Sequence, residues 1–233
     1  VLGTHSLLEA SRKYFSSFKN QISKHFLFHH VSTDEVYGDL KIDDDAFRED
    51  NPYAPSSPYS ASKACSDHLV RAWFRTYSLP VLITNCSNNY GPFQNQEKFI
   101  PKIISSAINE KEIPIYGDGM QIRDWLYVED HVKAINTVLL NGKIGETYNI
   151  GGNSELTNIE VARIICSLMD ELVPHRNIES YHDLIIHIDD RLGHDKRYAI
   201  DPKKINTELN WHAEETFESG IKKTLDWYLM KKI

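Results

Sequence analysis

Long apolar runs, basic clusters and paired cysteines are all missing from this chain of 233 residues. No stretch approaches the ~18–20 apolar residues that a helix needs to cross a bilayer. Acidic residues outnumber basic ones by 33 to 26, and no Lys/Arg block occurs, which argues against a nucleic-acid surface. The three cysteines, Cys65, Cys86 and Cys166, are scattered without metal-ligand spacing. We therefore expect a reduced, cytoplasmic protein that binds neither membrane nor nucleic acid.

A glycine-rich phosphate-binding motif is missing as well. Neither Gly117-Asp118-Gly119 nor Gly151-Gly152 continues with the spacing Gly-x-x-Gly-x-x-Gly, which binds a dinucleotide pyrophosphate at the start of a helix. The first residue is Val1 and not methionine. We therefore expect the chain to be a segment of something longer.

Helical and extended stretches alternate along most of the sequence. The spacing of apolar residues predicts helices at 59–77, 98–109, 129–140, 158–172 and 215–230, with a further helix that begins at Leu7. It predicts strands at 26–31, 81–86, 113–116, 123–128, 146–150, 185–189 and 196–200. This alternation predicts an α/β fold, with a doubly wound parallel sheet and a smaller C-terminal α/β domain. In such sheets ligands bind at the carboxyl ends of the strands.

Tyr59 and Lys63 lie four residues apart in the sequence YSASK, at the start of a predicted helix. This spacing puts both side chains on one helix face. A nearby ammonium favours the phenolate, so we expect Lys63 to lower the pKa of Tyr59 from ~10 toward neutrality. Such a tyrosine can accept a proton from an alcohol as hydride leaves its carbon. Taken alone, the same spacing is also typical of an ordinary solvated helix face.

Two adjacent acids, Asp34 and Glu35, follow the predicted strand that ends at Val31. Their repulsion pushes the two pKa values apart, which suits a reaction that needs one protonated and one ionised carboxyl group. The alternative is that Asp34 caps a short helix, as aspartate commonly does. The preceding His29 and His30 face opposite sides of the strand, and no third ligand is spaced to join them, so we expect no metal site.

Seven segments resemble, in the same order, the extended short-chain dehydrogenase/reductase family, and within it the sugar-nucleotide 4,6-dehydratases. They are STDEVYGDL, YAPSSPYSASKACSDHLVRAW, TNCSNNYGP, QIRDWLYVEDH, GETYNIGG, GHDKRYAID and ETFESGIKKTLDWYL. The resemblance runs from Gly3 to about Leu229. It implies a partial Rossmann-like sheet that lacks its N-terminal strands, with NAD as cofactor and dTDP-glucose as substrate.

The resemblance also implies a domain division and an assembly. Residues 1–92 and 123–150 would form the NAD-binding domain, and residues 93–122 and 151–233 the nucleotide-sugar-binding domain. Members of the family are usually homodimers, joined through a bundle of four helices that includes the helix of Tyr59 and Lys63.

Separate catalytic roles follow from the same resemblance. Tyr59, with Lys63 and Thr33, would oxidise the sugar at C4 and pass hydride to NAD. The resulting ketone acidifies the C5 proton, which Glu35 would remove while Asp34 protonates the departing C6 hydroxyl. Epimerases of the family typically carry another residue, often serine, at the position of Asp34. The pair of acids therefore favours dehydration.

Further residues are implied in binding. Arg123 and Arg191 would hold the nucleotide diphosphate, because a planar guanidinium bonds phosphate oxygens in a bidentate manner. Asn88 would contact the sugar. Asn89, together with the catalytic tyrosine and lysine, would lie near the nicotinamide. The other nucleotide-sugar contacts would be Thr33, Lys98, Phe99, Pro114, Tyr116, Asn158 and His194. A related UDP-sugar dehydratase or epimerase, and a non-catalytic remnant, stay open as alternatives.

Overall fold

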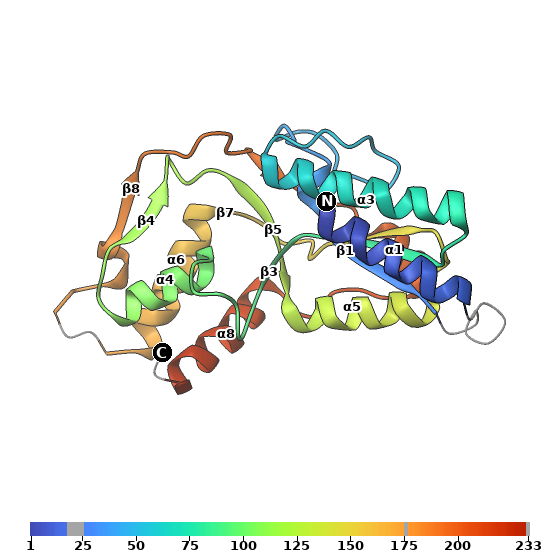
Figure 1. Ribbon diagram of the computed structural model, residues 1–233. Coiled ribbons are helices and arrows are strands. Elements are labelled where there is room, and N and C mark those ends of the chain that lie inside the picture. The colour runs from blue at the N-terminus through green and yellow to red at the C-terminus, as the bar shows by residue number, and fades with distance from the viewer. Residues whose placement is uncertain (18–25, 175–176, 232–233) are drawn as a thin grey trace.

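Two lobes lie side by side, with the strand β5 (Ile122–Tyr127) between them (Figure 1). The computed structural model describes residues 1–17, 26–174 and 177–231. The first lobe holds a parallel sheet with helices on both faces, and the second holds shorter strands and the C-terminal helix. The predicted α/β fold with parallel strands is therefore confirmed.

A three-stranded parallel sheet forms the centre of the first lobe. Its order is β1 (Phe28–Thr33), β2 (Val81–Cys86) and β6 (Thr147–Ile150). β2 lies in the middle, and every one of its residues except the last is buried. Because helices cover both faces of the sheet, successive residues of β2 are all buried, and this explains why its sequence VLITN is largely apolar without alternation.

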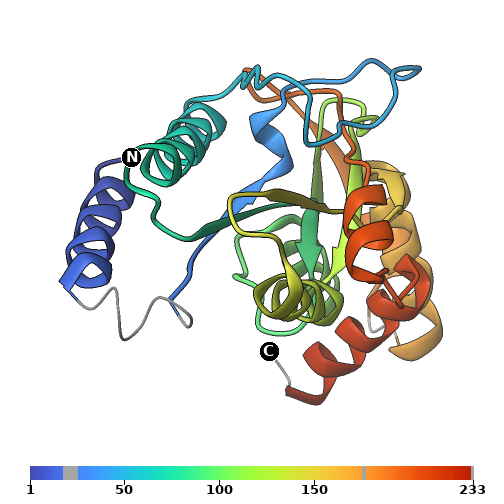
Figure 2. The same cartoon turned by 90° about the vertical axis from the view of Figure 1, so that its right-hand side faces the viewer.

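Helices cover both faces of this sheet (Figure 2). They are α1 (Leu2–Ser17) and α3 (Pro58–Tyr77) on one face and α5 (Val128–Asn141) on the other. Successive residues of a strand point to opposite faces. Accordingly, Val81 and Ile83 pack in a cluster with residues of α1 and α3, whereas Leu82 packs with residues of α5.

The second lobe has its own apolar core. Its strands are β3 (Asn88–Tyr90), β7 (Glu155–Thr157) and β9 (Arg197–Tyr198), which join β5, and β4 (Ile113–Tyr116) paired with β8 (Ile185–Ile188). Its helices are α4 (Phe99–Ile108), α6 (Asn158–Leu172), η2 (Tyr181–Leu184) and α8 (Phe217–Lys231). Ile104, Ile165 and Leu225 are completely buried where α4, α6 and α8 meet.

Several boundaries differ from the predicted ones. β1 ends at Thr33, two residues later than predicted, because Ser32 and Thr33 pair in register with the end of β2. α1 begins at Leu2 and not at Leu7. The short helix α7 (Lys203–Leu209) was not predicted, and its Ile205 packs in the cluster of α5 and β6 in the first lobe. The division of the chain into two domains stays a prediction.

Within the described ranges, no helix combines the length and apolarity that crossing a membrane requires.

Candidate active site

The carboxyl ends of the parallel strands bring Thr33, Cys86 and Ile150 into register at one edge of the sheet. A short 3-10 helix, η1 (Asp34–Val36), follows directly. Thr33 caps η1, since its hydroxyl accepts a hydrogen bond from the Glu35 backbone N–H at 3.3 Å and donates to an Asp34 carboxyl oxygen at 3.2 Å. The alternative in which Asp34 is the cap is therefore wrong, and the carboxyl group of Asp34 is available for another role.

Asp34 has the properties of an acid that keeps its proton. Only 3% of the residue is exposed, and one carboxyl oxygen has no hydrogen-bond partner among the described residues. Burial, followed by the negative charges of Glu35 and Asp124, raises the pKa of Asp34 to about 8. Burial therefore matters more than the predicted repulsion between the two neighbouring acids. At neutral pH Asp34 is protonated and can donate a proton.

Glu35 lies in a more polar environment than Asp34. It is half-buried, and burial raises the pKa of its carboxyl group. The positive charges of Arg123, Arg191 and Lys98 act in the opposite direction. Three basic residues from separate segments thus act on one carboxylate, against the negative charge of Asp195, and their positive charge suits an anionic substrate.

Tyr59 lies beside the two acids in the first turn of α3, and 55% of it is exposed. Burial and the charge of Glu35 raise the pKa of Tyr59. The ammonium of Lys63 instead donates a hydrogen bond to the Val31 carbonyl at 2.8 Å. The predicted lowering of the pKa of Tyr59 by Lys63 is therefore contradicted in this structure, because the backbone carbonyl holds the lysine.

The strand β3 presents Asn88 and Asn89. Asn88 is half-buried, and the side chain of Asn89 is held by the protein. Asn89 Nδ2 donates to the Ser87 carbonyl at 3.0 Å, and Asn89 Oδ1 lies 2.8 Å from Nδ1 of His131. Sequence reasoning missed His131 and also Cys86, although both lie in the matched segments TNCSNNYGP and QIRDWLYVEDH. Burial raises the pKa of the Cys86 thiol to about 12, so this thiol stays neutral.

Arg123 is a buried cation, with 5% of it exposed. Its guanidinium donates to the carbonyls of Ile122 and Asp195 at 2.7 and 2.9 Å. The guanidinium carbon lies 4.4 Å from the centre of the Tyr198 ring, as in a cation–π contact. The two carbonyls and the Tyr198 ring thus hold the guanidinium of Arg123 in place without neutralising its positive charge. Asp195 and Tyr198 lie in the segment GHDKRYAID, and sequence reasoning missed both.

Arg191 and His194 lie on a loop of the second lobe, close to Tyr116 at the end of β4. His194 Nδ1 is 2.7 Å from a carboxyl oxygen of Asp190, and the rings of His194 and Tyr116 are 6.4 Å apart in an edge-on arrangement. Arg191 is exposed, and its charge still lowers the pKa of Glu35. These side chains are thus placed to meet a ligand that extends from the acids toward the second lobe.

The remaining predicted contacts lie on elements of the second lobe (Figure 1). Lys98 precedes the first residue of α4, and the ring of Phe99 stacks on Trp125 at 6.2 Å. Pro114 lies in β4, and Asn158 opens α6 with its side chain 3.5 Å from that of Gln121. The structure therefore brings together Thr33, the two acids, Tyr59 and the basic residues Arg123, Arg191 and Lys98, while Phe99, Pro114 and Asn158 lie on other elements of the second lobe.

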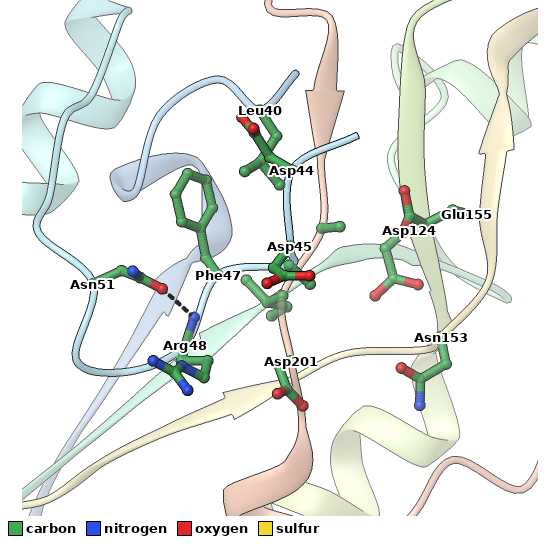
Figure 3. A pocket seen from close by; sticks show the side chains of 13 residues that line it. Leu40, Asp44, Asp45, Phe47, Arg48, Asn51, Asp124, Asn153, Glu155 and Asp201 are labelled. Carbon is green, nitrogen blue, oxygen red and sulfur yellow. Dashed lines mark hydrogen bonds between the residues drawn. The ribbon is translucent and has the colours of Figure 1, made fainter. Parts of the chain in front are cut away.

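A cavity of about 570 Å3 opens elsewhere, between the loop after β1 and the end of β9 (Figure 3). Asp44, Asp45, Asp124 and Asp201 contribute carboxyl groups to it, and the Arg48 backbone bonds the Asn51 side chain at 2.6 Å. The described part of the chain contains no group of three or more His, Cys, Asp or Glu residues that could hold a metal ion.

Known proteins resemble this chain in sequence and in fold. The family model described as GDP-mannose 4,6 dehydratase matches residues 1–224. The dTDP-glucose 4,6-dehydratase of Neisseria meningitidis serogroup B is 57% identical over 234 residues, and the match covers 100% of this chain and 66% of that protein. This chain therefore spans less than two thirds of the length of that relative.

Two crystal structures show the likeness in fold. The dTDP-glucose 4,6-dehydratase of Bacillus anthracis in complex with NAD gives a TM-score of 0.86 at 44% identity, covering 100% of this chain and 68% of that one. DesIV, the dTDP-glucose 4,6-dehydratase of Streptomyces venezuelae with NAD and TYD bound, gives 0.87 at 40% identity, covering 100% and 66%. The Rossmann-like architecture predicted for the first lobe agrees with both.

Proposed function

Because the chain belongs to the GDP-mannose 4,6-dehydratase family, we propose that its site dehydrates dTDP-glucose to dTDP-4-keto-6-deoxyglucose. The observation that carries this proposal is the pair of acids beside Tyr59. Asp34 keeps its proton at neutral pH because burial raises its pKa to about 8; burial also raises the pKa of Glu35, but there three positive charges oppose the shift, which leaves Glu35 the more readily ionised of the two acids. Expulsion of water needs this combination, since one proton must leave C5 while another joins the departing oxygen at C6.

The residues around the site fit one end of NAD. Tyr59 is more than half exposed beside the acids, and Tyr59, Lys63 and Asn89 would hold the nicotinamide end. The 233 residues contain no Gly-x-x-Gly-x-x-Gly sequence for the pyrophosphate. Held by Tyr59, Lys63 and Asn89, NAD would supply the reversible hydride transfer that the reaction needs at C4 and C6 of the sugar.

Each polar group of the site has one task. The Thr33 hydroxyl and the Tyr59 side chain bind the C4 hydroxyl, and Tyr59, in its phenolate form, accepts the proton of that hydroxyl. The C4 ketone acidifies the C5 proton, which Glu35 removes. Asp34 donates its proton to the C6 oxygen, the C6–O bond breaks, and water leaves. Glu35 then returns its proton to C5. Lys63 is the cation within reach that can lower the pKa of Tyr59 when it moves away from the Val31 carbonyl.

The nucleotide diphosphate would bind where the positive charges converge. Arg123, Arg191 and Lys98 all act on Glu35, so a diphosphate bound between them leaves the attached sugar within reach of the acids. Asn88 would bind the sugar from β3. The nucleotide would extend along Phe99, Pro114, Tyr116, Asn158 and His194 in the second lobe.

The assembly we propose is a homodimer in the cytoplasm, joined through α1 and α3 of each copy. The two helices pack against each other, and exposed apolar residues remain on them, with 62% of Leu7 and 53% of Tyr14 exposed. All three cysteines are free, as expected in a reducing compartment. Residues 1–92 with 123–150 and residues 93–122 with 151–233 would form the cofactor and sugar domains.

One half-reaction tests this proposal without NAD. dTDP-4-keto-6-deoxyglucose already carries the C4 ketone, so the chain alone should exchange its C5 proton with deuterium oxide by using Glu35 as base. We expect an acceleration of roughly 100- to 10,000-fold over buffer, the usual contribution of a general base, measured by proton NMR. Glu35→Gln should return the rate to that of buffer, whereas Glu97→Gln, at an exposed position, should match the wild type.

Two outcomes contradict the proposal in different ways. If the wild-type chain binds dTDP but exchanges the C5 proton no faster than buffer, the dehydratase chemistry is wrong for this site. If Glu35→Gln exchanges the proton as fast as the wild type, the site is active and the base has been assigned to the wrong residue.

A further inference from the structure

Residues 195–198 connect three segments of the candidate site that are far apart in sequence. The Asp195 carbonyl accepts a hydrogen bond from Arg123 of β5 at 2.9 Å. One carboxyl oxygen of Asp39, four residues after Glu35, accepts from the backbone N–H groups of Lys196 and Arg197 at 2.7 and 3.0 Å. The segment after the acids and the buried arginine are thus both attached to residues 195–198.

The third connection runs through the Asp195 carboxylate. Asp195 is buried, with 7% of it exposed, and a single oxygen of its carboxylate accepts hydrogen bonds from the hydroxyls of Ser56 and Tyr198. Tyr198 lies under the Arg123 guanidinium, so this carboxylate also fixes the ring that supports the arginine. Hydrogen bonds to an ionised acceptor are about twice as strong as those between neutral groups.

Ser56 leads directly into the helix that carries Tyr59. Ser57 is the N-cap of α3 and forms a capping box with Ser60, so the first turn of α3 is rigid from Ser57 onward. A bond at Ser56 therefore sets where this turn begins, and with it the position of the Tyr59 phenol. Ser56 and Asp195 are 139 residues apart in sequence, so the contact is purely tertiary.

We propose that Asp195 is a positioning residue that fixes the distance between the Arg123 end of the site and the Tyr59 phenol, by holding Ser56 with its carboxylate and Arg123 with its carbonyl. This inference rests on the proposed function. A nucleotide sugar held by its diphosphate at Arg123 reaches Tyr59 only if that distance matches the length of the sugar. Misplacement by about 1 Å can reduce a rate roughly 100-fold, so the link matters for chemistry more than for affinity.

The test separates binding from positioning in the chain itself. The Cζ signal of Tyr59 is observed by NMR with 13C-labelled tyrosine and assigned with Tyr59→Phe, and the affinity for dTDP-glucose is measured by calorimetry. In the wild type, dTDP-glucose should shift the Tyr59 signal. In Ser56→Ala the affinity should stay within about threefold of the wild type, because Arg123 keeps its contacts, while the shift of the Tyr59 signal is lost.

Matched variants distinguish this role from a loss of stability. Ser56→Thr restores a hydroxyl and should restore the shift of the Tyr59 signal. Asp195→Ala should weaken binding and also abolish the shift. Ser17→Ala removes an exposed hydroxyl that bonds only a carbonyl of its own helix in the described structure, and should behave as wild type. Urea unfolding of each variant checks that binding and shift do not simply follow the folded fraction.

The result that overturns the inference is a Ser56→Ala variant that binds dTDP-glucose and shows the full wild-type shift of Tyr59. The proposed function survives that result, because the acids and Arg123 are unchanged. If the wild-type chain itself does not bind dTDP-glucose, the positioning role and the proposed substrate are both wrong.

Discussion

Asp34 is a carboxyl group in a place where an anion is poorly stabilised. Thr33 donates to one of its oxygens at 3.2 Å, and the other oxygen has no hydrogen-bond partner among the described residues. The negative charges of Glu35 and Asp124 also disfavour the ionised form of Asp34. A buried carboxylate needs several hydrogen-bond donors or a nearby cation to stay ionised. Asp34 has too few of these, so its carboxyl group keeps its proton and stays neutral. The same environment that makes Asp34 an acid therefore makes it increasingly unfavourable for stability as the pH rises from ~4 toward about 8.

The substitution Asp34→Asn should stabilise the chain in a pH-dependent manner. The pKa of Asp34 is about 8 in the folded chain and an ordinary ~4 in the unfolded chain. Between these values the folded chain binds a proton that the unfolded chain has released, so the free energy of unfolding falls as the pH rises. The asparagine side chain does not titrate in this pH range, so its contribution to the free energy of unfolding does not change with pH. We expect Asp34→Asn to raise the free energy of unfolding by of the order of 1–4 kcal/mol at about pH 7.5, and by much less at about pH 4.5.

Urea titrations at the two pH values measure this difference. Asp43→Asn, at an exposed position of the following loop, is the matched control and should change stability by less than ~0.5 kcal/mol at both. A stabilisation by Asp34→Asn that is equal at both pH values would mean that Asp34 is ionised in the folded chain, and the acid role would fail with it.

β1 is an edge strand of the parallel sheet in the first lobe. It lies at the end of the order β1-β2-β6, paired with β2 on one side, and 41% of Val31 is exposed. β6 lies at the opposite end, but its outer edge is covered, since the backbone N–H of Asn149 donates to Glu49 at 2.8 Å. An edge strand with unpaired backbone groups opens more easily than a strand that is paired on both sides.

Hydrogen exchange should therefore rank the three strands. We expect the amides of β1 to exchange at least ~10-fold faster than those of β2, with Asn149 of β6 protected by its bond to Glu49. Mass spectrometry or NMR of the chain in deuterium oxide measures this order. Equal protection of β1 and β2 would mean that another surface covers the free edge in solution, and a concentration series would show whether a second copy supplies it.

The spacing of apolar residues predicts the long helices and strands well, because each of them contains enough residues to show its own apolar pattern. α3, β2 and α6 were expected within about a residue of their observed bounds, as the spacing of apolar positions determines them locally. The short strands β3 and β7 depend on partners that are distant in sequence, so no local pattern predicts them, and the strand predicted at 196–200 is observed only at its centre, as β9. The candidate site divides in the same way: Tyr59 with Lys63 is visible as a spacing, but the bond of Ser56 to Asp195 is not.

At the scale of the molecule, the chain provides a more complete binding site for the nucleotide sugar than for NAD. The nucleotide sugar has one buried cation, Arg123 on β5, and two exposed cations of the second lobe, Arg191 and Lys98, and all three act on Glu35. NAD has Tyr59, Lys63 and Asn89 at one end and no glycine-rich turn for its pyrophosphate in the 233 residues. A pyrophosphate bound at such a turn gains several backbone N–H bonds and the helix dipole together, and a nicotinamide contact alone does not replace them.

The chain should therefore bind dTDP well and NAD poorly. We expect calorimetry to give a Kd for NAD at least ~10-fold higher than that for dTDP, a difference of about 1.4 kcal/mol or more. Arg123→Lys should weaken dTDP binding, because an ammonium loses the bidentate geometry, and should leave the weak NAD binding unchanged. Tight NAD binding at one molecule per chain would show that other backbone groups in this chain hold the pyrophosphate. The first lobe would then be a complete cofactor site despite its three-stranded sheet.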